Sequence, residues 1–236
     1  MKNIYSVSAQ GAHVERIESM NSFFRRVYHW MAAGLILTAV AAHWVASSPS
    51  VFRALAGVFP VLIIVELGLV LGLSWGLNRI SATTAMVMFM VYSLVNGVTL
   101  SAVLLVYTRE SVFSAFLTTA GMFGAMSVYG LYTKRDLSAW RSFLTMGLIG
   151  LVIAMLVNMF VGNGVADIVI SAVGVLVFMG LTAYDTQYLR NLGEQVDIDS
   201  GDATAQKLAV MGALKLYLDF INLFLYLLRL FGRRRD

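Results

Sequence analysis

Long apolar runs divided by short polar connections make up nearly all of this chain. Seven of the runs reach or approach the ~20 residues that a helix needs to cross the hydrocarbon core of a bilayer. The connections hold residues that interrupt helices, such as SSP at 47–49 and GNG at 162–164, and they are too short for a second folded domain. The predicted spans are Val27–Ala46, Ala54–Leu77, Ala82–Val106, Val112–Tyr132, Phe143–Val161, Ile168–Tyr188 and Ala209–Phe231.

The composition supports the same interpretation. Of the 236 residues, 59% are hydrophobic and 13% are charged, which is more apolar surface than a soluble domain can bury. We therefore expect an all-α integral membrane protein built as a seven-transmembrane-helix bundle. Its expected parts are a cytoplasmic N-terminal segment at 1–26, a single membrane domain at 27–232 and a basic tail at 233–236.

The basic residues indicate how the chain is oriented. The net charge is +4, and Lys and Arg lie at the ends of the apolar runs rather than along one face, which favours membrane topology and argues against nucleic-acid binding. With the N-terminus in the cytoplasm, the inner segments carry ten Lys and Arg residues, whereas the outer loops carry only Arg53 and Arg109. The inner set is Lys2, Arg16, Arg25, Arg26, Arg79, Lys134, Arg135, Arg141, Arg190 and Lys207.

For the last apolar run, the distribution of Lys and Arg and the length of the run give different predictions of whether it crosses the membrane. A full crossing leaves Arg233, Arg234 and Arg235 outside, whereas a re-entrant segment returns them to the cytoplasm. We favour a full crossing, because Ala209–Phe231 is long enough to span the bilayer.

Three acidic residues, Glu66, Asp185 and Asp219, fall within apolar runs. A charge at that depth is expensive, so such acids face the interior of a bundle or a water-filled cavity. They mark either an ion or proton pathway or a structural hydrogen bond or ion pair. Two acids that can meet favour the pathway.

Depth in the membrane predicts that Asp185 and Asp219 meet. Asp185 precedes Arg190 by five residues, ~7.5 Å along a helix, and Asp219 follows Lys215 by four, ~6 Å. If both basic side chains extend to the inner interface, the two carboxyls lie at similar depth on neighbouring antiparallel helices. Lys215 could instead pair with Asp219, one helical turn away.

A stripe of small and polar residues on each of the last two runs supports the same pairing. Such stripes face inward on membrane helices, and two facing stripes would make a narrow hydrophilic path. Two close carboxyls cannot both ionise cheaply and would share a proton, whereas the ionised pair offers oxygen ligands to calcium. We therefore predict a pH-gated cation pathway at Asp185 and Asp219. The stripes are Ser171, Gly174, Thr182 and Asp185 on the sixth run, and Gly212, Lys215, Asp219, Asn222 and Tyr226 on the seventh.

Three glycines, Gly68, Gly72 and Gly76, repeat every four residues in the second run. This spacing lets another backbone approach closely, so we expect the stripe to pack inside the bundle, with Glu66 on roughly the opposite side of the helix. The chain has no cysteine, which excludes disulfides, thiolate metal sites and cysteine nucleophiles, and its three histidines form no local cluster. We expect neither enzymatic activity nor a resident cofactor.

Three motifs give the chain a resemblance to a known family. They are FGAMSVYGLYTKRDLS at 123–138, GLTAYDTQ at 180–187 and LYLDFINLFLYLLRLFG at 216–232. The chain resembles the Bax inhibitor-1 family, the transmembrane Bax-inhibitor-motif proteins, in its bacterial branch. The resemblance covers nearly the whole chain, and it implies a seven-helix bundle with the last helix central and a bacterial inner-membrane location.

The resemblance also implies a function and a site. The family is linked to pH-sensitive calcium leak across membranes, and two aspartates on its last two helices form the pH sensor, which match Asp185 and Asp219 here. An acid in the second helix recurs in the family and matches Glu66, which we therefore expect to belong to the pH-sensing or ion-pathway residues with Asp185 and Asp219. In some members an arginine cluster latches the aspartate pair, but only Arg79 lies near the corresponding place in this chain.

The main alternative is a non-transporting regulator that binds other membrane proteins. The resemblance suggests one such partner, since some bacterial members associate with an ATP-dependent membrane protease. The contact surfaces would be the polar segment 1–26 and the loop 189–207. That loop carries several acidic residues, but their spacing is not that of an EF-hand, so we interpret it as a solvated acidic loop. The acids are Glu194, Asp197, Asp199 and Asp202.

Two other classes of membrane protein with buried carboxyls are disfavoured. An intramembrane aspartyl protease could use Tyr184 and Asp185, but it also needs a Gly-x-Gly-Asp motif, and Asp219 follows Leu-Tyr-Leu instead. A retinal protein could use Lys215, but the third run has no acid to act as counter-ion.

Overall fold

Nine helical elements make up the computed structural model, which describes residues 2–76, 79–195 and 203–235. Seven of these helices are long and apolar enough to cross a membrane, so the expected seven-helix membrane bundle is confirmed. The elements are α1 (Lys2–Ala46), α2 (Pro49–Ala56), α3 (Phe59–Gly76), α4 (Ala82–Val106), α5 (Arg109–Tyr132), the 3-10 turn η1 (Ser138–Trp140), α6 (Arg141–Val161), α7 (Gly164–Gly193) and α8 (Ala203–Phe231).

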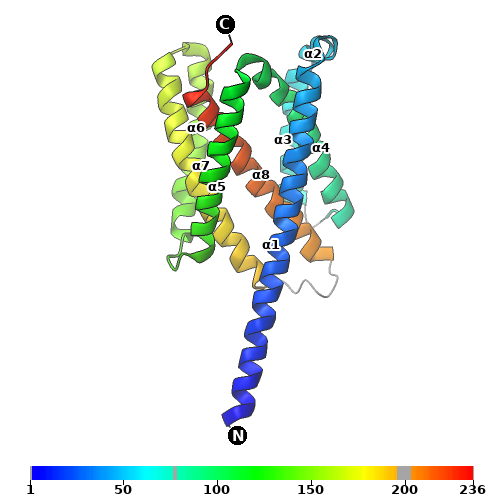
Figure 1. Cartoon of the computed structure of the whole chain (residues 1–236), viewed down its shortest axis with the longest axis vertical. Helices are drawn as coiled ribbons and strands as arrows, with labels where there is room; N and C mark the ends of the chain where they lie inside the picture. The colour runs from blue at the N-terminus through cyan, green and yellow to red at the C-terminus, as the bar shows by residue number, and fades with distance from the viewer. Residues whose placement is uncertain (1, 77–78, 196–202, 236) are drawn as a thin grey trace.

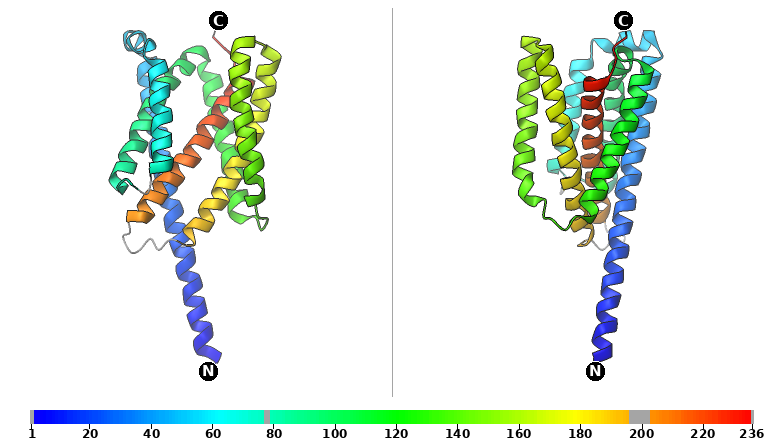
Figure 2. Two further views of the ribbon diagram at one scale, coloured as in Figure 1. Left: turned by 180° about the vertical axis from the view of Figure 1, so that it is seen from behind. Right: turned by 60° about the vertical axis from the view of Figure 1, so that its left-hand side comes forward.

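The two termini lie at opposite ends of the bundle (Figure 1). The N-terminal part of α1 projects well beyond the other helices, and the two further views show the same projection (Figure 2). α8 contacts α1, α4, α5 and α7, and it buries a larger share of its residues than any other span. Since α8 begins near the N-terminal end and finishes at the opposite end, the last helix crosses the bundle completely.

The two segments expected to flank the membrane domain, 1–26 and 233–236, have defined structure in their described parts. α1 continues through residue 26 without a break, so the polar N-terminal segment is helical. The basic tail forms a strap over the turn between α4 and α5: the amide of Thr108 donates to the carbonyl of Arg233 (3.0 Å), and the amide of Arg235 donates to the carbonyl of Val106 (2.8 Å). Asp236 lies outside the described residues.

Side-chain caps close the short turns between spans. Ser81 and Thr108 each accept a backbone amide at the start of α4 and α5, and Asn163 accepts two at the start of α7. Gly162 ends α6 with φ of 69°, in the left-handed region that favours glycine. These caps satisfy helix ends at the membrane boundary, where unpaired backbone groups are costly.

The second predicted span is wrong in one respect, because the run Ala54–Leu77 is not one helix. It is divided at Gly57 and Val58 into the end of α2 and the start of α3. Pro49 begins α2 directly after α1, as proline suits the first turn of a helix. Hydrophobicity alone did not separate the two helices. Leu77, the end of the predicted span, lies outside the described residues.

Only part of the glycine stripe of this span packs inside the bundle: Gly72 is half-buried, and a Cβ added there would lie 3.0 Å from Cε of Met88 on α4. Gly68 is exposed, and a Cβ added there would meet nothing within 4 Å. α3 packs against α4, and its one buried residue is Leu73, seven positions after Glu66 and on the same side of the helix. The bundle-facing side of α3 therefore follows Glu66 and Leu73, with Gly72 near its edge and Gly68 away from it.

One close approach that requires glycine joins α1 and α4. A Cβ added at Gly97 would lie 2.5 Å from the carbonyl oxygen of Thr38 and 2.7 Å from Cβ of Ala41. Both neighbours belong to α1, which packs against α4 and α8, so neither atom can move away from an added methyl without shifting the helix. This contact sets the distance between α1 and α4.

We predict that Gly97→Ala lowers the free energy of unfolding by about 1–3 kcal/mol, because the added methyl overpacks this contact. Gly68→Ala is the matched control; it has open space and gains helix propensity, so its stability stays equal or rises slightly. Thermal unfolding of both variants in the same detergent measures the difference. Equal midpoints for Gly97→Ala and the wild type would contradict this account of the packing.

Candidate functional site

A buried ion pair joins α7 to α8. Nζ of Lys215 lies 3.1 Å from Oδ1 of Asp185, whose side chain is 9% exposed, while that of Lys215 is 38% exposed. The ammonium also lies 5.4 Å from the ring centroid of Tyr188, within the range of a cation–π contact. Arg141, at the start of α6, adds a second positive charge near Asp185.

Asp219 completes this group, which we call the aspartate–lysine cluster (Asp185, Lys215 and Asp219). It is buried and interacts electrostatically with both other members. Its Oδ2 atom is enclosed and has no hydrogen-bond partner among the residues that the structure describes. Such a group is costly unless it gains a partner or a proton, so Asp219 is a point where the cluster can respond to protonation.

The positions expected for Lys215 and Arg190 need correction. Lys215 does not simply extend to the inner interface, and its ion-pair partner is Asp185 rather than Asp219. α7 and α8 cross so that Asp185 faces the ammonium, and the aromatic face of Tyr188 stabilises the same charge. Arg190 instead donates from Nη1 to the carbonyl of Leu131 (2.7 Å), where it neutralises the negative end of α5.

Gln187, within the GLTAYDTQ motif, holds the neighbouring loop in place. Its Oε1 accepts from the amide of Leu137 (2.8 Å), and its Nε2 donates to the carbonyl of Arg135 (2.8 Å). In the same loop, two hydrogen bonds from Ser138 to the carboxylate hold the pKa of Asp136 below its usual range. The segment between α5 and α6 is thereby tied to α7 close to Asp185.

The two polar stripes face each other, but the expected hydrophilic path between them is not formed. The ring of Tyr226 lies directly over Gly174, and its hydroxyl donates to Sδ of Met155 (3.4 Å). Asn222 donates to the carbonyl of Leu218 on its own helix. Ser171 and Thr182 also bond to carbonyls of their own helix. These polar groups are satisfied locally, and an aromatic ring fills the space where a path was expected.

Glu66 does not join the aspartate–lysine cluster. It lies in a second polar group at the contact between α3 and α4, where Oε1 accepts from Thr99 (2.7 Å) and Oε2 accepts from Asn96 (3.3 Å). Tyr217 of α8 donates to Oδ1 of Asn96 (3.0 Å), and Thr38 of α1 lies 2.6 Å from the Tyr217 hydroxyl. We call these five residues the Glu66 network.

Most of this network was missed from the sequence. Asn96 and Thr99 sit three residues apart on α4, a spacing that places them on one face and could have indicated a polar stripe. Tyr217 gave no comparable signal, since an aromatic residue in a membrane helix is ordinary. Arg79 is exposed, and within the described ranges the ion pairs are Lys215–Asp185 and Arg190–Glu194, so Arg79 latches neither cluster.

Two further buried oxygens lack a hydrogen-bond partner among the described residues. They are Oγ of Ser127 on α5 and Oγ1 of Thr186 on α7. The phenol of Tyr28 on α1 is the polar group that interacts with both. The unsatisfied oxygens therefore lie on α5, α7 and α8, three helices that pack against one another.

No group of three or more Asp, Glu or His side chains that could hold a metal ion occurs in the described part of the chain. Asp185 and Asp219 supply two carboxylates, but the ammonium of Lys215 already neutralises one of them. In the acidic loop, Glu194 approaches Arg190 (3.9 Å). Asp197, Asp199 and Asp202 lie outside the described residues.

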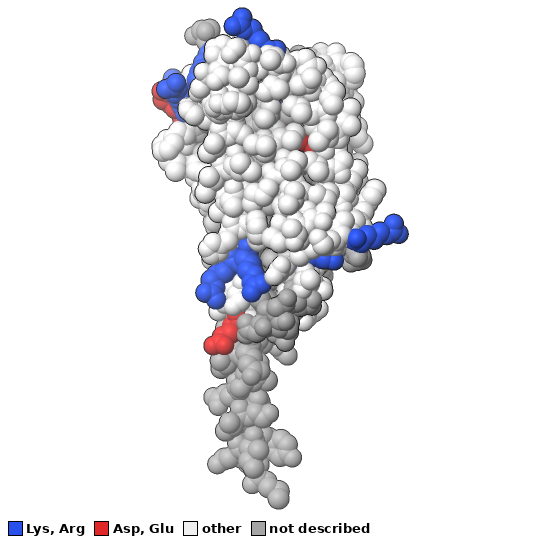
Figure 3. All heavy atoms as spheres, turned by 90° about the vertical axis from the view of Figure 1, so that its right-hand side faces the viewer, with Lys and Arg blue, Asp and Glu red and all other residues white. Residues whose placement is uncertain are grey.

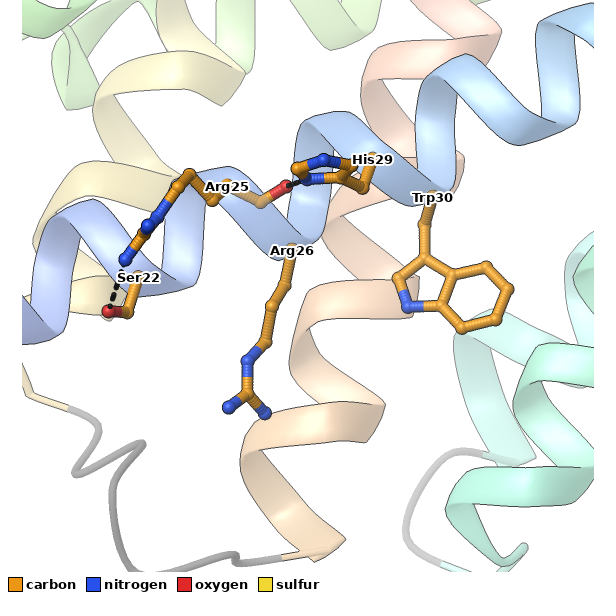
Figure 4. A pocket seen from close by; sticks show the side chains of 5 residues that line it. All are labelled: Ser22, Arg25, Arg26, His29 and Trp30. Carbon is orange, nitrogen blue, oxygen red and sulfur yellow. Dashed lines mark hydrogen bonds between the residues drawn. The ribbon is translucent and has the colours of Figure 1, made fainter.

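Charged residues on the surface lie mainly at the two ends of the bundle. One side of the bundle is almost wholly uncharged between a basic group at each end (Figure 3). Where α1 leaves the bundle, a shallow hollow is lined by charged and aromatic side chains, and Arg25 bends toward Ser22 while Arg26 points away (Figure 4). Its lining residues are Ser22, Arg25, Arg26, His29 and Trp30.

The fold and its buried ionisable groups define a multi-pass helical membrane protein with an ion pair between its last two helices. The chain belongs to the Bax inhibitor family, because the family model described as inhibitor of apoptosis-promoting Bax1 matches residues 20–236. It is 48% identical to inner membrane protein YbhL of Escherichia coli (strain K12) over 219 residues, which cover 92% of this chain and 93% of that protein. It is 44% identical to an uncharacterized protein of Deinococcus radiodurans, with 93% and 94% of the two chains covered.

We predict that Lys215→Met lowers the free energy of unfolding by about 2 kcal/mol, because it leaves the buried carboxylate of Asp185 uncompensated while the partly exposed lysine limits the loss. Adding Asp185→Asn to the same chain should restore most of the stability, since the charge that needed a partner is gone. Thermal unfolding in detergent at fixed pH is the measurement. Lys207→Met, also on α8, is the control, and a Lys215→Met protein as stable as this control would contradict the assignment of the ion pair.

Proposed function

We propose that this protein is a pH-sensitive cation leak pathway, with calcium as its cargo, in which the aspartate–lysine cluster is the gate. The observation that carries the proposal is the enclosed Oδ2 of Asp219, without a described partner, beside the ion pair of Asp185 and Lys215. Ionisable groups inside a membrane bundle are expensive to maintain, and they mark ion or proton pathways by default. In this proposal the conformation described corresponds to a closed gate, since Lys215 and the ring of Tyr226 occupy the interface between α7 and α8.

The chemistry of the gate follows from its count of charges. Two carboxyls and one ammonium are neutral together when one carboxyl keeps its proton. Loss of that proton leaves one uncompensated negative charge in a low-dielectric site, which favours separation of the helices or entry of a cation. The other ionisable groups that face the cluster are Arg141 on α6 and the phenols of Tyr184 and Tyr188 on α7.

We also propose that the protein lies in the bacterial inner membrane with its N-terminus in the cytoplasm. The excess of Lys and Arg at the N-terminal end of the bundle supports this orientation, and the Escherichia coli relative is named an inner membrane protein. The strap at Arg233–Arg235 would then face the outside. A single cysteine at Arg235 should react with an impermeant maleimide in intact cells, whereas one at Ser6 should react only after lysis; the reverse pattern would invert the orientation.

A regulator that does not transport ions is the second candidate. The projection of α1 beyond the bundle and the basic hollow beside Arg25 and Arg26 favour it, since both could contact another protein, such as an ATP-dependent membrane protease. Cation flux distinguishes the two proposals. Purified protein that carries no flux in liposomes at any pH would support the regulator.

We predict that wild-type protein in liposomes carries a calcium flux that depends on pH, and that Asp219→Asn and Asp185→Asn each abolish the pH dependence. An amide has the shape of a carboxyl but cannot exchange the proton on which the gate depends. Asp167→Asn, at the opposite end of α7, is the matched control and should keep the wild-type profile. An unchanged pH profile in both cluster variants would show that the cluster is not the gate.

A further inference from the structure

The Glu66 network is a polar group that the proposed gate does not use. It connects four helices through side chains: Thr38 on α1, Glu66 on α3, Asn96 and Thr99 on α4, and Tyr217 on α8. Tyr217 is fully buried, and its ring packs edge-on against Phe89 and Tyr92. Hydrogen bonds that link four helices thus lead to the carboxyl of Glu66, and their directions determine which protonation state of Glu66 they stabilise.

Counting protons shows that the hydrogen bonds of the network cannot all form at once. Three contacts involve the hydroxyls of Thr38 and Tyr217: Thr38 to the carbonyl of Ser93 (2.8 Å), Thr38 to Tyr217 (2.6 Å) and Tyr217 to Oδ1 of Asn96 (3.0 Å). Two hydroxyls supply only two protons. If Tyr217 donated to Thr38, the buried Oδ1 of Asn96 would lose its donor, which is costly. The favoured order therefore runs from Thr38 to Tyr217 to Asn96.

This order fits the orientation that the amide of Asn96 has in the structure, with its oxygen toward Tyr217. Because its oxygen accepts from Tyr217, its nitrogen faces Oε2 of Glu66 and donates a proton to it. A reversed amide would direct its oxygen at the carboxyl, which suits only a protonated Glu66. The hydroxyl of Tyr217 thus donates to Asn96 in the amide orientation that stabilises the ionised carboxylate.

Thr99 allows the same site to hold a proton. Its hydroxyl has one proton and two acceptors in reach, Oε1 of Glu66 (2.7 Å) and the carbonyl of Asn96 (2.9 Å). When Glu66 is ionised, Thr99 donates to it. When Glu66 is protonated, the carboxyl donates to Thr99, and Thr99 donates to the carbonyl. Both states are satisfied without movement of heavy atoms.

No charged side chain that the structure describes beside Glu66 would hold its carboxyl in one protonation state. The ionisable groups that interact with it are the phenols of Tyr92 on α4 and Tyr217 on α8. No cationic side chain within the described ranges pairs with it. Its ionisation therefore depends on the hydrogen bonds that it receives.

We propose that Glu66 is a second proton-binding site, separate from the aspartate–lysine cluster, and that Tyr217 is its positioning residue. Tyr217 acts through Asn96: it holds the amide so that the nitrogen donates to the carboxylate. Tyr217 lies two residues before Asp219 on α8, so any movement of this helix changes the hydrogen bonding of Glu66. The inference does not depend on cation conduction, and its failure would leave the proposed function untouched.

The test follows the protonation of Glu66 with a lipid-soluble carbodiimide, which adds to protonated carboxyls and is read by mass spectrometry of the peptide that holds residue 66. Glu66 is half-buried at the side of the bundle and so can be reached from the lipid. Labelling of the full-length protein should fall as pH rises, and Glu66→Gln should remove it. If wild-type Glu66 stays unlabelled at every pH, the proton-binding site is excluded.

Substitutions then separate the positioning role from a merely structural one. Asn96→Leu removes the donor and should move the pH of half-labelling upward by about one unit, because the ionised form loses a charge-assisted hydrogen bond. Tyr217→Phe should move it in the same direction by a smaller amount. Tyr28→Phe, which removes a phenol that interacts with Ser127 and Thr186 rather than with Glu66, is the matched control and should leave it in place.

The double variant gives the sharpest outcome. If Tyr217 acts only through Asn96, Asn96→Leu with Tyr217→Phe should show the same half-labelling pH as Asn96→Leu alone. Additive shifts would overturn the positioning role, and so would a Tyr217→Phe profile that matches Tyr28→Phe. Should Tyr217→Phe fail to fold, an unmoved profile in Asn96→Leu would overturn the inference by itself.

Discussion

The cost of placing charge inside a membrane governs the arrangement of the last two helices. Asp185 and Lys215 lie within spans, and neither could remain charged there without the other. Their pairing draws α7 and α8 together, Tyr226 then packs over Gly174, and Asp219 is enclosed beside them. The interface thus holds one satisfied ion pair and one carboxyl without a described partner. A single proton can change the energy of such an interface substantially.

α8 connects this interface with the rest of the bundle. On one side it carries Lys215 and Asp219 against α7, and on another it carries Tyr217 into the Glu66 network of α1, α3 and α4. These contacts lie within five residues of one helix, so displacement of α8 acts on both groups together. The strap of residues 233–235 ties its far end to the turn between α4 and α5. This arrangement suits a helix that transmits changes between two halves of a bundle.

The sequence was sufficient for the features that depend on burial cost and short connections. Those constraints predicted seven spans and a meeting of the sixth with the seventh near Asp185 and Asp219. Helical periodicity gives the face of a residue but not the neighbour it meets, so the partner of Lys215 and the exposure of Gly68 could not be predicted. The role of Tyr217 depends on a hydroxyl contact between four helices, and no spacing in one segment encodes it.

We infer that the proton of the aspartate–lysine cluster sets how α7 and α8 lie against each other. The chain has no cysteine of its own, so single cysteines can be introduced in place of Asn191 on α7 and Ala203 on α8 and spin-labelled. Pulsed electron paramagnetic resonance then measures the distance between the two labels, and so between the two helices. The distance distribution should change with pH in the otherwise wild-type protein and stay fixed after Asp219→Asn. A distribution that does not respond to pH in the first protein, or responds equally in both, would contradict the claim.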